Sequence, residues 1–473
     1  MAKIKVYRYG EADEPSFPED YEVLKKAVLQ VTDIKSNHNK YYAIELHQAG
    51  SKYRVFTHYG RTDDLETNPD AGVKQTRHGG MNEAEAEYAS IYKQKTSSRK
   101  GYKELNLASS KIGSSKSRGQ SSGHVDAETL SKINTETPKK KKTKTVKSAI
   151  SPDIQSFVQY IYAEATNALT RTVQANITAN GIETPLGVLT LGQIDKGQEI
   201  LDELYKLFQN KKKSNDQMVG LSGDFYTVIP HRIGRTRAAA QQAVITTLED
   251  FNQKQETLQL MRDMLSVSGK DAQVLVNPEV DKKYDALGCA IEMLRDDKFK
   301  EIKEYVEKSQ IKRSNIKVKN VYSLCRPEEQ KAFSTSLKNT RLLFHGSRAK
   351  NWVGILSRGL LLPKIVVSLG VNRTDAGWLG NGIYFGDAVC TTLYYTSAGR
   401  NRGTRMMAIA NVALGKVKDY TKITYGLQGP PSGHHSCHGV RSKSGNYSQF
   451  ADDEFVVYNH NQQKLEYLVE YTA

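Results

Sequence analysis

Residues 342–387 read LLFHGSRAKNWVGILSRGLLLPKIVVSLGVNRTDAGWLGNGIYFGD, and they decide the fold of the C-terminal part of the chain. Their apolar start predicts a β-strand that ends at His345, Gly346 and Ser347, where a ligand can approach the backbone. Later in the stretch, glycines stand directly before a second predicted strand, which carries Tyr384. Because glycine lets a backbone pass close to a ligand, we expect the two segments to be opposite walls of one cleft.

Each segment alone is a weak indication of a site. A His-Gly-Ser triplet is more often a strand-to-turn junction, and a glycine-rich turn before an aromatic strand is more often a hairpin corner. A third element, DDEFVVY at residues 452–458, makes the combination more specific. In order and spacing the three elements resemble the catalytic domain of the poly(ADP-ribose) polymerase family over residues 338–473. The family's His-Tyr-Glu signature falls on His345, Tyr384 and Glu454.

The resemblance implies NAD+ as a substrate and no metal ion. Breaking the glycosidic bond of NAD+ leaves an oxocarbenium-like ribose, so the site must position groups and stabilise charge. The resemblance gives Glu454 the task of holding a ribose hydroxyl, favouring the positive charge at the anomeric carbon and orienting the acceptor. Without the resemblance, Glu454 would be interpreted as a solvated strand-edge carboxylate beside Asp452 and Asp453.

The resemblance also assigns the nicotinamide pocket. It implies that the backbone of Gly346 and the hydroxyl of Thr392, which replaces the family's serine, hold the carboxamide of nicotinamide. Tyr395 is expected to stack on the nicotinamide ring, with Tyr384 on the other side of the pocket. Tyr394 is the alternative if the register shifts by one.

The remaining assignments concern the ribose and the adenosine half. The resemblance implies that His345 binds a ribose hydroxyl and that Ser347 and Asn351 line the adenosine side. Two positions depart from the DNA-dependent members: Thr391 replaces a lysine, and Leu361 replaces an arginine. Several stretches are more similar to the vault-associated branch of the family, which leaves product length open. The histidine-rich GHHSCHG at 433–439 is interpreted as a border of the NAD+ cleft rather than as a metal site.

The composition allows several domains and an acidic partner. The 473 residues are 38% hydrophobic, and one core rarely exceeds about 250–300 residues, so we expect about three domains. The formal net charge is +16. This charge favours nucleic acid over a membrane, because no apolar run approaches the roughly 20 residues that span a bilayer. Plain solubility is the alternative. The four dispersed cysteines and the absence of a visible signal peptide favour an intracellular, reducing compartment.

Residues 1–105 are predicted to form a small, mainly β domain. Residues 40–47 and 52–59 have strand composition and are separated by a hairpin turn, and Asn82 is expected to cap a following helix. HYGR at residues 58–61 makes the domain similar to the WGR module of DNA-dependent family members, with a tyrosine in place of the tryptophan. The resemblance implies that Tyr59 and Arg61 contact nucleic acid by stacking and by a phosphate contact. A sheet aromatic and a solvated charge are the alternatives.

Two further segments separate this domain from the cleft. Residues 106–147 have the composition of a linker that is too polar to fold on its own. They end in PKKKKTKTVK, which indicates a nuclear import signal, a phosphate contact or a solvated spacer. Residues 148–270 are predicted to be helical. TPLGVLTLGQI and DFYTVIPH resemble loops of the family's regulatory helical domain.

We therefore expect an α+β multidomain protein with a small β-rich WGR-like domain, an all-α helical bundle and a mixed antiparallel β catalytic domain over residues 271–473. Within the catalytic domain, residues 452–458 and 465–471 are expected to form a hairpin.

The expected function is DNA-dependent transfer of ADP-ribose from NAD+, forming poly(ADP-ribose) on the protein itself and on protein acceptors in the DNA-damage response. DNA ends or nicks are the expected trigger and no membrane is involved. The expected location is the nucleus, or the cytoplasm of a prokaryote, without secretion. The alternatives are a mono-ADP-ribosyltransferase and a nucleic-acid-binding scaffold with an inactive catalytic domain.

Overall fold

The computed structural model describes residues 4–125, 148–173, 175–178, 181–209, 214–231, 233–268, 279–311, 315–360, 362, 377–445 and 447–473. The chain divides into two compact units, which are described separately. The first contains the described residues up to 125 and those from 169 to 268, and the second contains 148–168 and the described residues from 279 onward. Within the described residues, no helix is long and apolar enough to cross a membrane.

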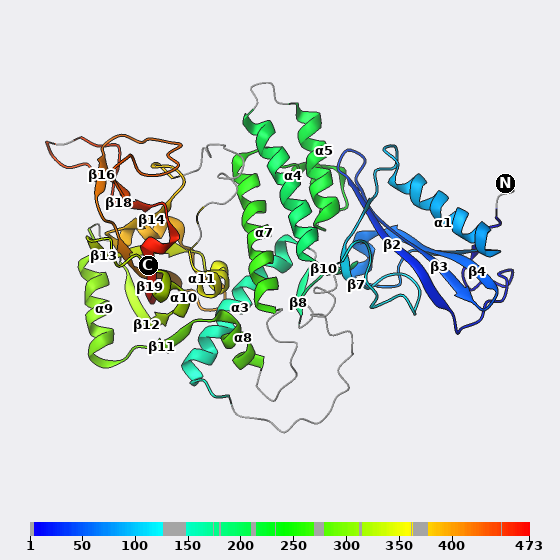
Figure 1. Cartoon of the computed structure of the whole chain (residues 1–473), viewed down its shortest axis with the longest axis horizontal. Coiled ribbons are helices and arrows are strands. Elements are labelled where there is room, and N and C mark those ends of the chain that lie inside the picture. Colours follow the sequence, from blue (N-terminus) through cyan, green and yellow to red (C-terminus); the bar gives the residue numbers. More distant parts are fainter. Residues whose placement is uncertain are drawn as a thin grey trace. The chain divides into compact units, whose positions relative to one another are not determined.

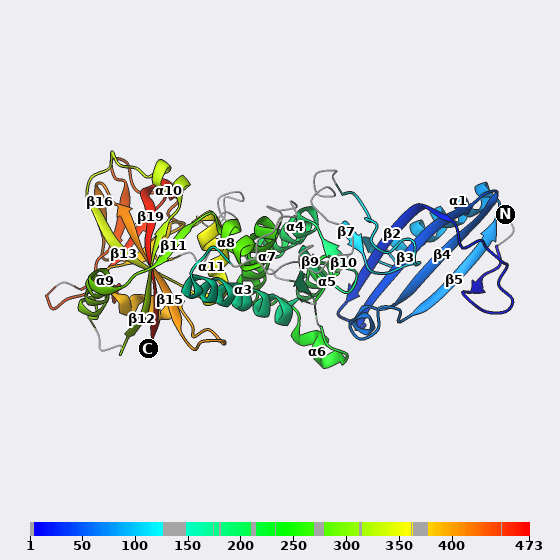
Figure 2. The ribbon, with the colours of Figure 1, turned by 90° about the horizontal axis from the view of Figure 1, so that it is seen from below.

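The N-terminal domain is a six-stranded antiparallel sheet with one covering helix (Figure 1). The strand order is β1-β5-β4-β3-β2-β6. The strands are β1 (Tyr7–Arg8), β2 (Glu22–Asp33), β3 (His38–Ala49), β4 (Lys52–Arg61), β5 (Val73–Gly79) and β6 (Lys103–Glu104). Helix α1 (Met81–Thr96) packs on β3, β4 and β5 (Figure 2). The predicted hairpin is confirmed, since Ala49 pairs with Lys52 and leaves a two-residue turn in which Gly50 has φ 59°.

The start of α1 differs from the prediction. The helix begins at Met81 and its N-cap is Gly80, so Asn82 lies inside the first turn. The Glu83 carboxylate accepts a 3.0 Å hydrogen bond from the Gly80 backbone N–H. The carboxylate therefore does the capping that the sequence pattern assigned to Asn82.

Residues 106–125 are folded, in contrast to the linker predicted from residue 106. Strand β7 (Leu107–Ser110) joins a second sheet, of order β7-β10-β9-β8, with β8 (Asn176–Thr178), β9 (Gly181–Glu183) and β10 (Gly187–Leu189). Beyond β7, the hydroxyls of Ser114 and Ser117 donate to the buried Glu45 carboxylate of β3, at 2.6 and 2.5 Å. A polar segment folds here because its serines complete the hydrogen bonds of a buried charge. Residues 126–147, with the predicted basic run, lie outside the described residues.

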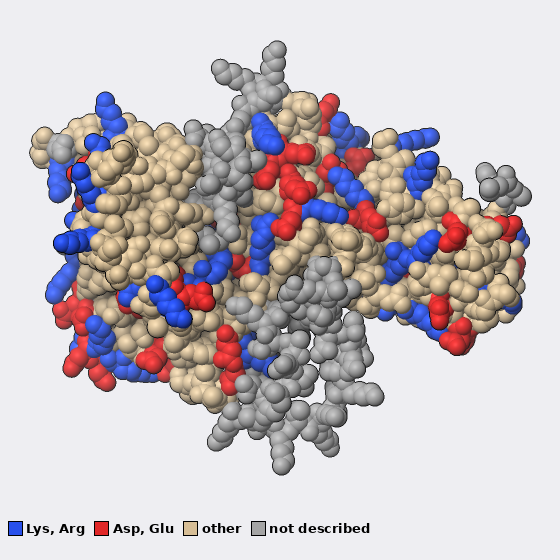
Figure 3. Space-filling model, in the orientation of Figure 1, with Lys and Arg blue, Asp and Glu red and all other residues tan. Residues whose placement is uncertain are grey.

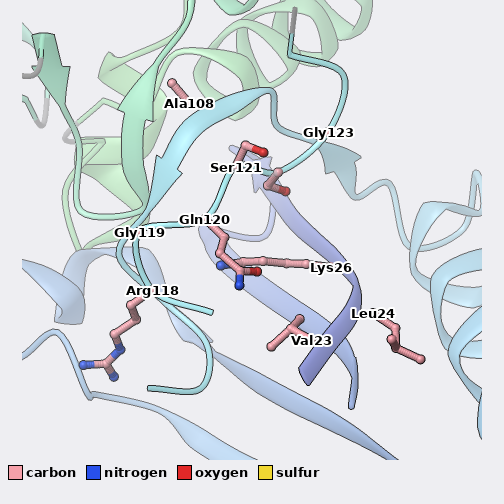
Figure 4. Close-up of a pocket in the computed structure, with 10 residues that line it drawn as sticks. Val23, Leu24, Lys26, Ala108, Arg118, Gly119, Gln120, Ser121 and Gly123 are labelled. Carbon is pink, nitrogen blue, oxygen red and sulfur yellow. The ribbon is translucent and has the colours of Figure 1, made fainter. Parts of the chain in front are cut away.

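The folded segment forms one wall of a cavity beside β2 (Figure 4). The cavity measures about 670 Å³ and is lined by Val23, Leu24, Lys26, Ala108 and residues 118–123. The Lys26 ammonium donates to the Ser117 carbonyl at 2.5 Å. Burial lowers the pKa of Lys26 to about 8. The cation is thus already used to hold the serine-rich segment against the sheet.

The helical part of the first unit packs on the N-terminal sheet. It contains α4 (Leu191–Gln209), α5 (Asn215–Val228), α6 (Arg237–Gln242) and α7 (Leu248–Ser268), and α4 contacts both α5 and α7. Helix α5 contacts β2, where the Thr32 N–H donates to the Thr227 hydroxyl at 2.7 Å. The prediction of an all-α bundle missed the small sheet that β7 completes, because strands of three or four residues give little periodic signal.

The second unit is built on a nine-stranded sheet of order β11-β12-β19-β15-β13-β14-β18-β17-β16. Its strands are β11 (Ala290–Met293), β12 (Lys317–Cys325), β13 (Thr340–Ser347), β14 (Ile383–Gly386), β15 (Arg405–Ala413), β16 (Val417–Tyr420), β17 (Ser436–Gly439), β18 (Glu454–Val457) and β19 (Gln463–Thr472). Only the β16–β17 pair among these is parallel. Its helices are the first part of α3 (Pro152–Thr172), α8 (Glu279–Leu287), α9 (Asp296–Lys308), α10 (Pro327–Ala332), α11 (Trp352–Arg358) and α13 (Val389–Thr392).

The predicted hairpin near the C-terminus is wrong. Strand β18 pairs with β14 and β17, whereas β19 pairs with β12 and β15. The short turn at His460–Gln462 therefore carries the chain across the sheet instead of closing a two-stranded ribbon. The prediction that these residues form strands is correct, but strand composition does not identify a strand's partner.

Candidate active site

The cleft lies where β13 and β14 separate. Strand β13 pairs with β15 as far as Ser347 but with β14 only at Phe344, which is opposite Gly386. Across β14, Gly386 is opposite Glu454 of β18. Beyond Phe344, the β14 side of β13 therefore carries no paired strand in the described part of the chain. This opening is where the sequence predicted two walls of one site.

His345 is held in one orientation. Its Nδ1 lies 2.9 Å from the carbonyl oxygen of Tyr384, and because a carbonyl only accepts, Nδ1 must carry the proton. Burial lowers the pKa of His345, so the ring is neutral near pH 7. Nε2 is then an acceptor, and it makes no hydrogen bond to any described residue. An acceptor at this position suits the hydroxyl of a ribose.

Tyr384 uses its hydroxyl for structure and its ring as a wall. The hydroxyl donates to the Gly380 carbonyl at 2.7 Å and accepts from the Leu379 N–H at 3.0 Å. Gly377 lies against the ring so closely that a Cβ there would be 2.1 Å from it. Burial, with a contribution from Glu454, raises the pKa of Tyr384. The phenol therefore stays neutral, and its fixed ring matches a wall for a flat ligand.

Glu454 is the carboxylate of the site that has no partner among the described residues. Its partly buried carboxylate makes no hydrogen bond or ion pair with the described residues. Burial, and secondarily the charge of Asp452, raises the pKa of Glu454 to about 7. The same carboxylate adds to the effect of burial in raising the pKa of Tyr395, so Glu454 lies close to both predicted tyrosines. A poised, unpartnered carboxylate is typical of a catalytic position.

Asp453, the acidic neighbour of Glu454, is bound by a network of donors that the sequence analysis did not predict. Asp453 accepts from His438 Nε2 at 2.8 Å and from the backbone N–H of Arg441 at 2.8 Å. The Arg441 guanidinium also reaches Asp453 at 3.2 Å and Asp387 at 2.8 Å. The run of three acids at 452–454 indicates that hydrogen-bond donors must lie nearby, but not which residues supply them. The network fixes the strand start that carries Glu454.

The histidines of the predicted cleft border have separate partners. His434 Nδ1 lies 3.2 Å from the Ser432 carbonyl, and His435 Nδ1 accepts from the Lys416 N–H at 3.0 Å. His438 lies between Asp419 and Asp453 and stacks on Phe455. Among the described residues, no three His, Cys, Asp or Glu side chains are grouped as metal ligands.

Gly346 and Thr392 lie in direct contact at the predicted nicotinamide pocket. A Cβ on Gly346 would be 2.7 Å from the Thr392 carbonyl oxygen and 2.9 Å from its Cβ. The Thr392 hydroxyl is buried and donates to the Val389 carbonyl at 2.7 Å. The hydroxyl predicted to hold the carboxamide is thus engaged within α13 in this structure. The glycine is required, because only a residue without Cβ fits this approach.

The other predicted lining residues are placed around this contact. Tyr395 is 56% exposed, so its ring is open to a ligand, and Tyr394 is 80% exposed. The Asn351 side-chain amide donates to the Ser347 hydroxyl at 3.1 Å, which joins the two residues predicted for the adenosine side. Thr391 is buried, and its Cβ would lie 3.1 Å from a Cβ on Gly386. Leu361 lies outside the described residues.

The predicted nucleic-acid residues belong to the first unit. Tyr59 stacks on Tyr42 with ring centroids 5.1 Å apart. Arg61 donates to Asp63 at 2.8 Å, to the Asn37 carbonyl at 3.0 Å and to the Gly234 carbonyl of the helical domain at 3.3 Å. On the face shown in Figure 3, basic and acidic side chains are interspersed.

The comparisons with known proteins agree with this architecture. The family described as "Poly(ADP-ribose) polymerase catalytic domain" matches residues 296–473, "Poly(ADP-ribose) polymerase, regulatory domain" matches 148–284, and "WGR domain" matches 25–108. The cleft with the poised glutamate, the neutral histidine and the tyrosine wall lies within the first of these matches, the catalytic domain. The chain belongs to the poly(ADP-ribose) polymerase family.

Similar relatives differ in their named product. Protein mono-ADP-ribosyltransferase PARP4 of Mus musculus is 34% identical over 325 residues, which cover 68% of this chain and 16% of the relative. Poly [ADP-ribose] polymerase 1 of Oryza sativa subsp. japonica is 29% identical over 70% of this chain and 36% of the relative. Poly [ADP-ribose] polymerase 2 of Homo sapiens is 25% identical over 94% of this chain and 78% of the relative. The chain spans less than a fifth of the mouse and human PARP4 proteins.

Proposed function

We propose that the chain transfers ADP-ribose from NAD+ to protein acceptors, itself included, and extends the product to poly(ADP-ribose). The observation that carries the proposal is the Glu454 carboxylate, which is open, partly buried and close to Tyr384 and Tyr395. Such a group can interact with a cationic ribose carbon at little reorganisation cost.

Each residue of the cleft has a role in this reaction. The Nε2 atom of the neutral His345 accepts a hydrogen bond from a ribose hydroxyl. The rings of Tyr384 and Tyr395 enclose the nicotinamide against Gly346. The bond between the anomeric carbon and the nicotinamide nitrogen breaks, and nicotinamide leaves with the electron pair. An acceptor oxygen then bonds to the anomeric carbon and passes its proton to the Glu454 carboxylate.

The adenosine side and the trigger are also part of the proposal. Ser347 and Asn351, already hydrogen-bonded to each other, line the adenosine half of NAD+. In the WGR domain, Tyr59 and Arg61 contact DNA ends or nicks. Because Arg61 binds the Gly234 carbonyl, a phosphate that recruited Arg61 would compete with a contact to the helical domain. Because DNA ends and nicks are the trigger, the protein acts in the DNA-damage response, which in a eukaryote takes place in the nucleus.

Automodification with labelled NAD+ tests the proposal. The full chain and Glu454→Gln are compared with and without nicked or blunt-ended DNA, and the products are separated by size. A DNA-stimulated ladder from the wild type, lost in the variant, is expected. If DNA binds but no label is incorporated under any condition, the protein is a nucleic-acid-binding scaffold and the proposal fails.

A second candidate is mono-ADP-ribosyl transfer by the same site. It is favoured by the name and the 34% identity of the PARP4 relatives, and by Thr391 at a position where DNA-dependent polymerases carry lysine. A single added unit from the wild type, with no ladder at any NAD+ concentration, would establish it.

A further inference from the structure

The wall that carries Tyr395 is supported from two sides within the second unit. Tyr395 lies between Thr392 and Thr396, and a loop of residues 397–404 follows. The Tyr471 hydroxyl is 2.9 Å from the Thr396 hydroxyl and 3.5 Å from that of Thr392. Tyr471 is fully buried in β19, so both ends of the turn that presents Tyr395 rest on the sheet.

The following loop is anchored on Glu470, the residue that precedes Tyr471 in β19. Glu470 is 1% exposed, and its carboxylate accepts from the Thr404 hydroxyl at 2.6 Å, from Asn320 at 2.8 Å and from Arg402 at 3.4 Å. Within the loop, the Gly399 N–H donates to the Thr404 carbonyl at 2.8 Å. The loop is therefore a closed turn anchored at its end by a buried charge.

Helix α3 supports the outer side of the same loop. Ser156, Tyr160 and Glu164 are spaced four residues apart, so they form one stripe along the helix. The Glu164 carboxylate accepts from the Asn401 N–H at 2.9 Å, and the Arg402 guanidinium donates to the Ser156 hydroxyl at 2.5 Å. The guanidinium also lies 4.6 Å from the centre of the Tyr160 ring.

The contact with Tyr160 is close. The Tyr160 hydroxyl donates to the Thr404 carbonyl at 3.4 Å, and a Cβ on Gly399 would lie 1.9 Å from that hydroxyl. The helix itself is fixed to the sheet by Phe157, which is fully buried and packs 4.5 Å from the ring of Tyr322. Helix α3 therefore packs on the sheet through Phe157 and contacts the 397–404 loop through Tyr160 and Glu164.

We propose that Tyr160 and Glu164 of α3 are positioning residues for the nicotinamide wall, acting through the 397–404 loop on Tyr395. The inference rests on the proposed nicotinamide pocket and extends it to the start of the regulatory segment. A shift of this helix face changes affinity for the nicotinamide half of NAD+ and leaves the ADP-ribose half unaffected.

Binding by the full chain of two probes tests the inference. Benzamide, an aryl carboxamide, reports the nicotinamide wall, and ADP-ribose reports the rest of the cleft. Glu164→Ala and Tyr160→Phe are expected to weaken benzamide binding by about tenfold, which corresponds to one lost hydrogen bond of ordinary strength. ADP-ribose affinity should stay within about twofold of wild type. Glu164→Gln keeps an acceptor for the Asn401 N–H and should restore most of the benzamide affinity.

Asp153→Asn is the matched control. Asp153 is in the first turn of the same helix, is not one of the three stripe residues, and pairs with Arg295. Its variant should bind both probes as the wild type does. Unchanged benzamide affinity in Glu164→Ala and Tyr160→Phe would overturn the inference, as would an equal loss for both probes. If the wild type itself binds ADP-ribose but not benzamide, the proposed pocket has failed, which is a distinguishable result.

Discussion

The imidazole of His345 is tied to the backbone of Tyr384, its partner in the signature, by a 2.9 Å hydrogen bond from Nδ1 to the carbonyl oxygen. Strands β13 and β14 pair only at Phe344, so beyond that residue this side-chain hydrogen bond links the two strands in place of backbone hydrogen bonds. It also fixes the tautomer, which decides that Nε2 accepts a hydrogen bond.

Replacing His345 with phenylalanine should weaken NAD+ binding without unfolding the chain. The phenyl ring preserves the contact with Phe385, whose ring centre is 5.7 Å from that of His345, but offers no acceptor for a ribose hydroxyl. We expect KM for NAD+ to rise by about tenfold, the equivalent of about 1 to 1.5 kcal/mol. Steady-state kinetics measure this change, and a KM equal to that of wild type would contradict it.

Activity should rise with pH through the titration of Glu454. The pKa of about 7 means that the carboxyl is largely protonated at pH 6 and largely ionised at pH 8, and the ionised form is the one that stabilises positive charge. The profile of kcat/KM should therefore rise with a midpoint near 7. Asp452→Asn removes the neighbouring negative charge and should move the midpoint to lower pH. A profile that is flat from pH 6 to 8 would refute the role of Glu454.

The same carboxyl should destabilise the fold at high pH. Its pKa is raised in the folded chain, so between its ordinary value and about 7 the folded state binds more protons than the unfolded state. Stability is therefore lost as pH rises through that window. Glu454→Gln should raise the free energy of unfolding by about 1 to 3 kcal/mol at pH 8 and by much less at pH 5. Thermal melts at both pH values test this, with Glu304→Gln on the exposed face of α9 as the control.

Gly346→Ala should abolish most activity. The new Cβ would meet the Thr392 backbone at 2.7 Å, so β13 and α13 must move apart at the pocket. A displacement of about 1 Å can cost about a hundredfold in rate, and we expect a loss in kcat/KM of that order. Gly429→Ala is the matched control, because a Cβ there meets nothing within 4 Å, and it should retain activity. Normal turnover by Gly346→Ala would show that the pocket lies elsewhere.

Two glycines three residues apart in α5 should respond in opposite directions. A Cβ on Gly220 meets nothing within 4 Å, so Gly220→Ala should stabilise the helix by about 0.5 to 1 kcal/mol. A Cβ on Gly223 would lie 2.7 Å from the Thr32 carbonyl of β2, so Gly223→Ala should cost about 1 to 3 kcal/mol. Denaturant unfolding measures both, and equal effects would argue against the packing of α5 on β2.

The sequence predicted local features better than distant partners. The end of β13 at Ser347 and the aromatic strand at Tyr384 follow from short patterns, and the structure places both at one opening. The folding of Ser114 and Ser117 could not be predicted, because their partner Glu45 is about seventy residues earlier in the chain and its burial depends on the sheet.

The same limit applies within the cleft. The residues next to Asp453 in the sequence do not show that His438 and Arg441 bind its carboxylate while Glu454 has no partner among the described residues. The partner of β18 was predicted wrongly for the related reason that strand composition does not identify the neighbouring strand.

Because the Glu454 carboxyl has no partner among the described residues, its protonation should affect the heat measured when substrate binds. At pH 7 about half of the unliganded molecules carry a proton on this carboxyl, since its pKa is about 7. The nicotinamide ring of NAD+ is a cation, and its arrival beside the carboxylate would favour the ionised form and expel that proton to solvent. Substrate binding would then be weaker in acid, and its measured heat would depend on the ionisation enthalpy of the buffer.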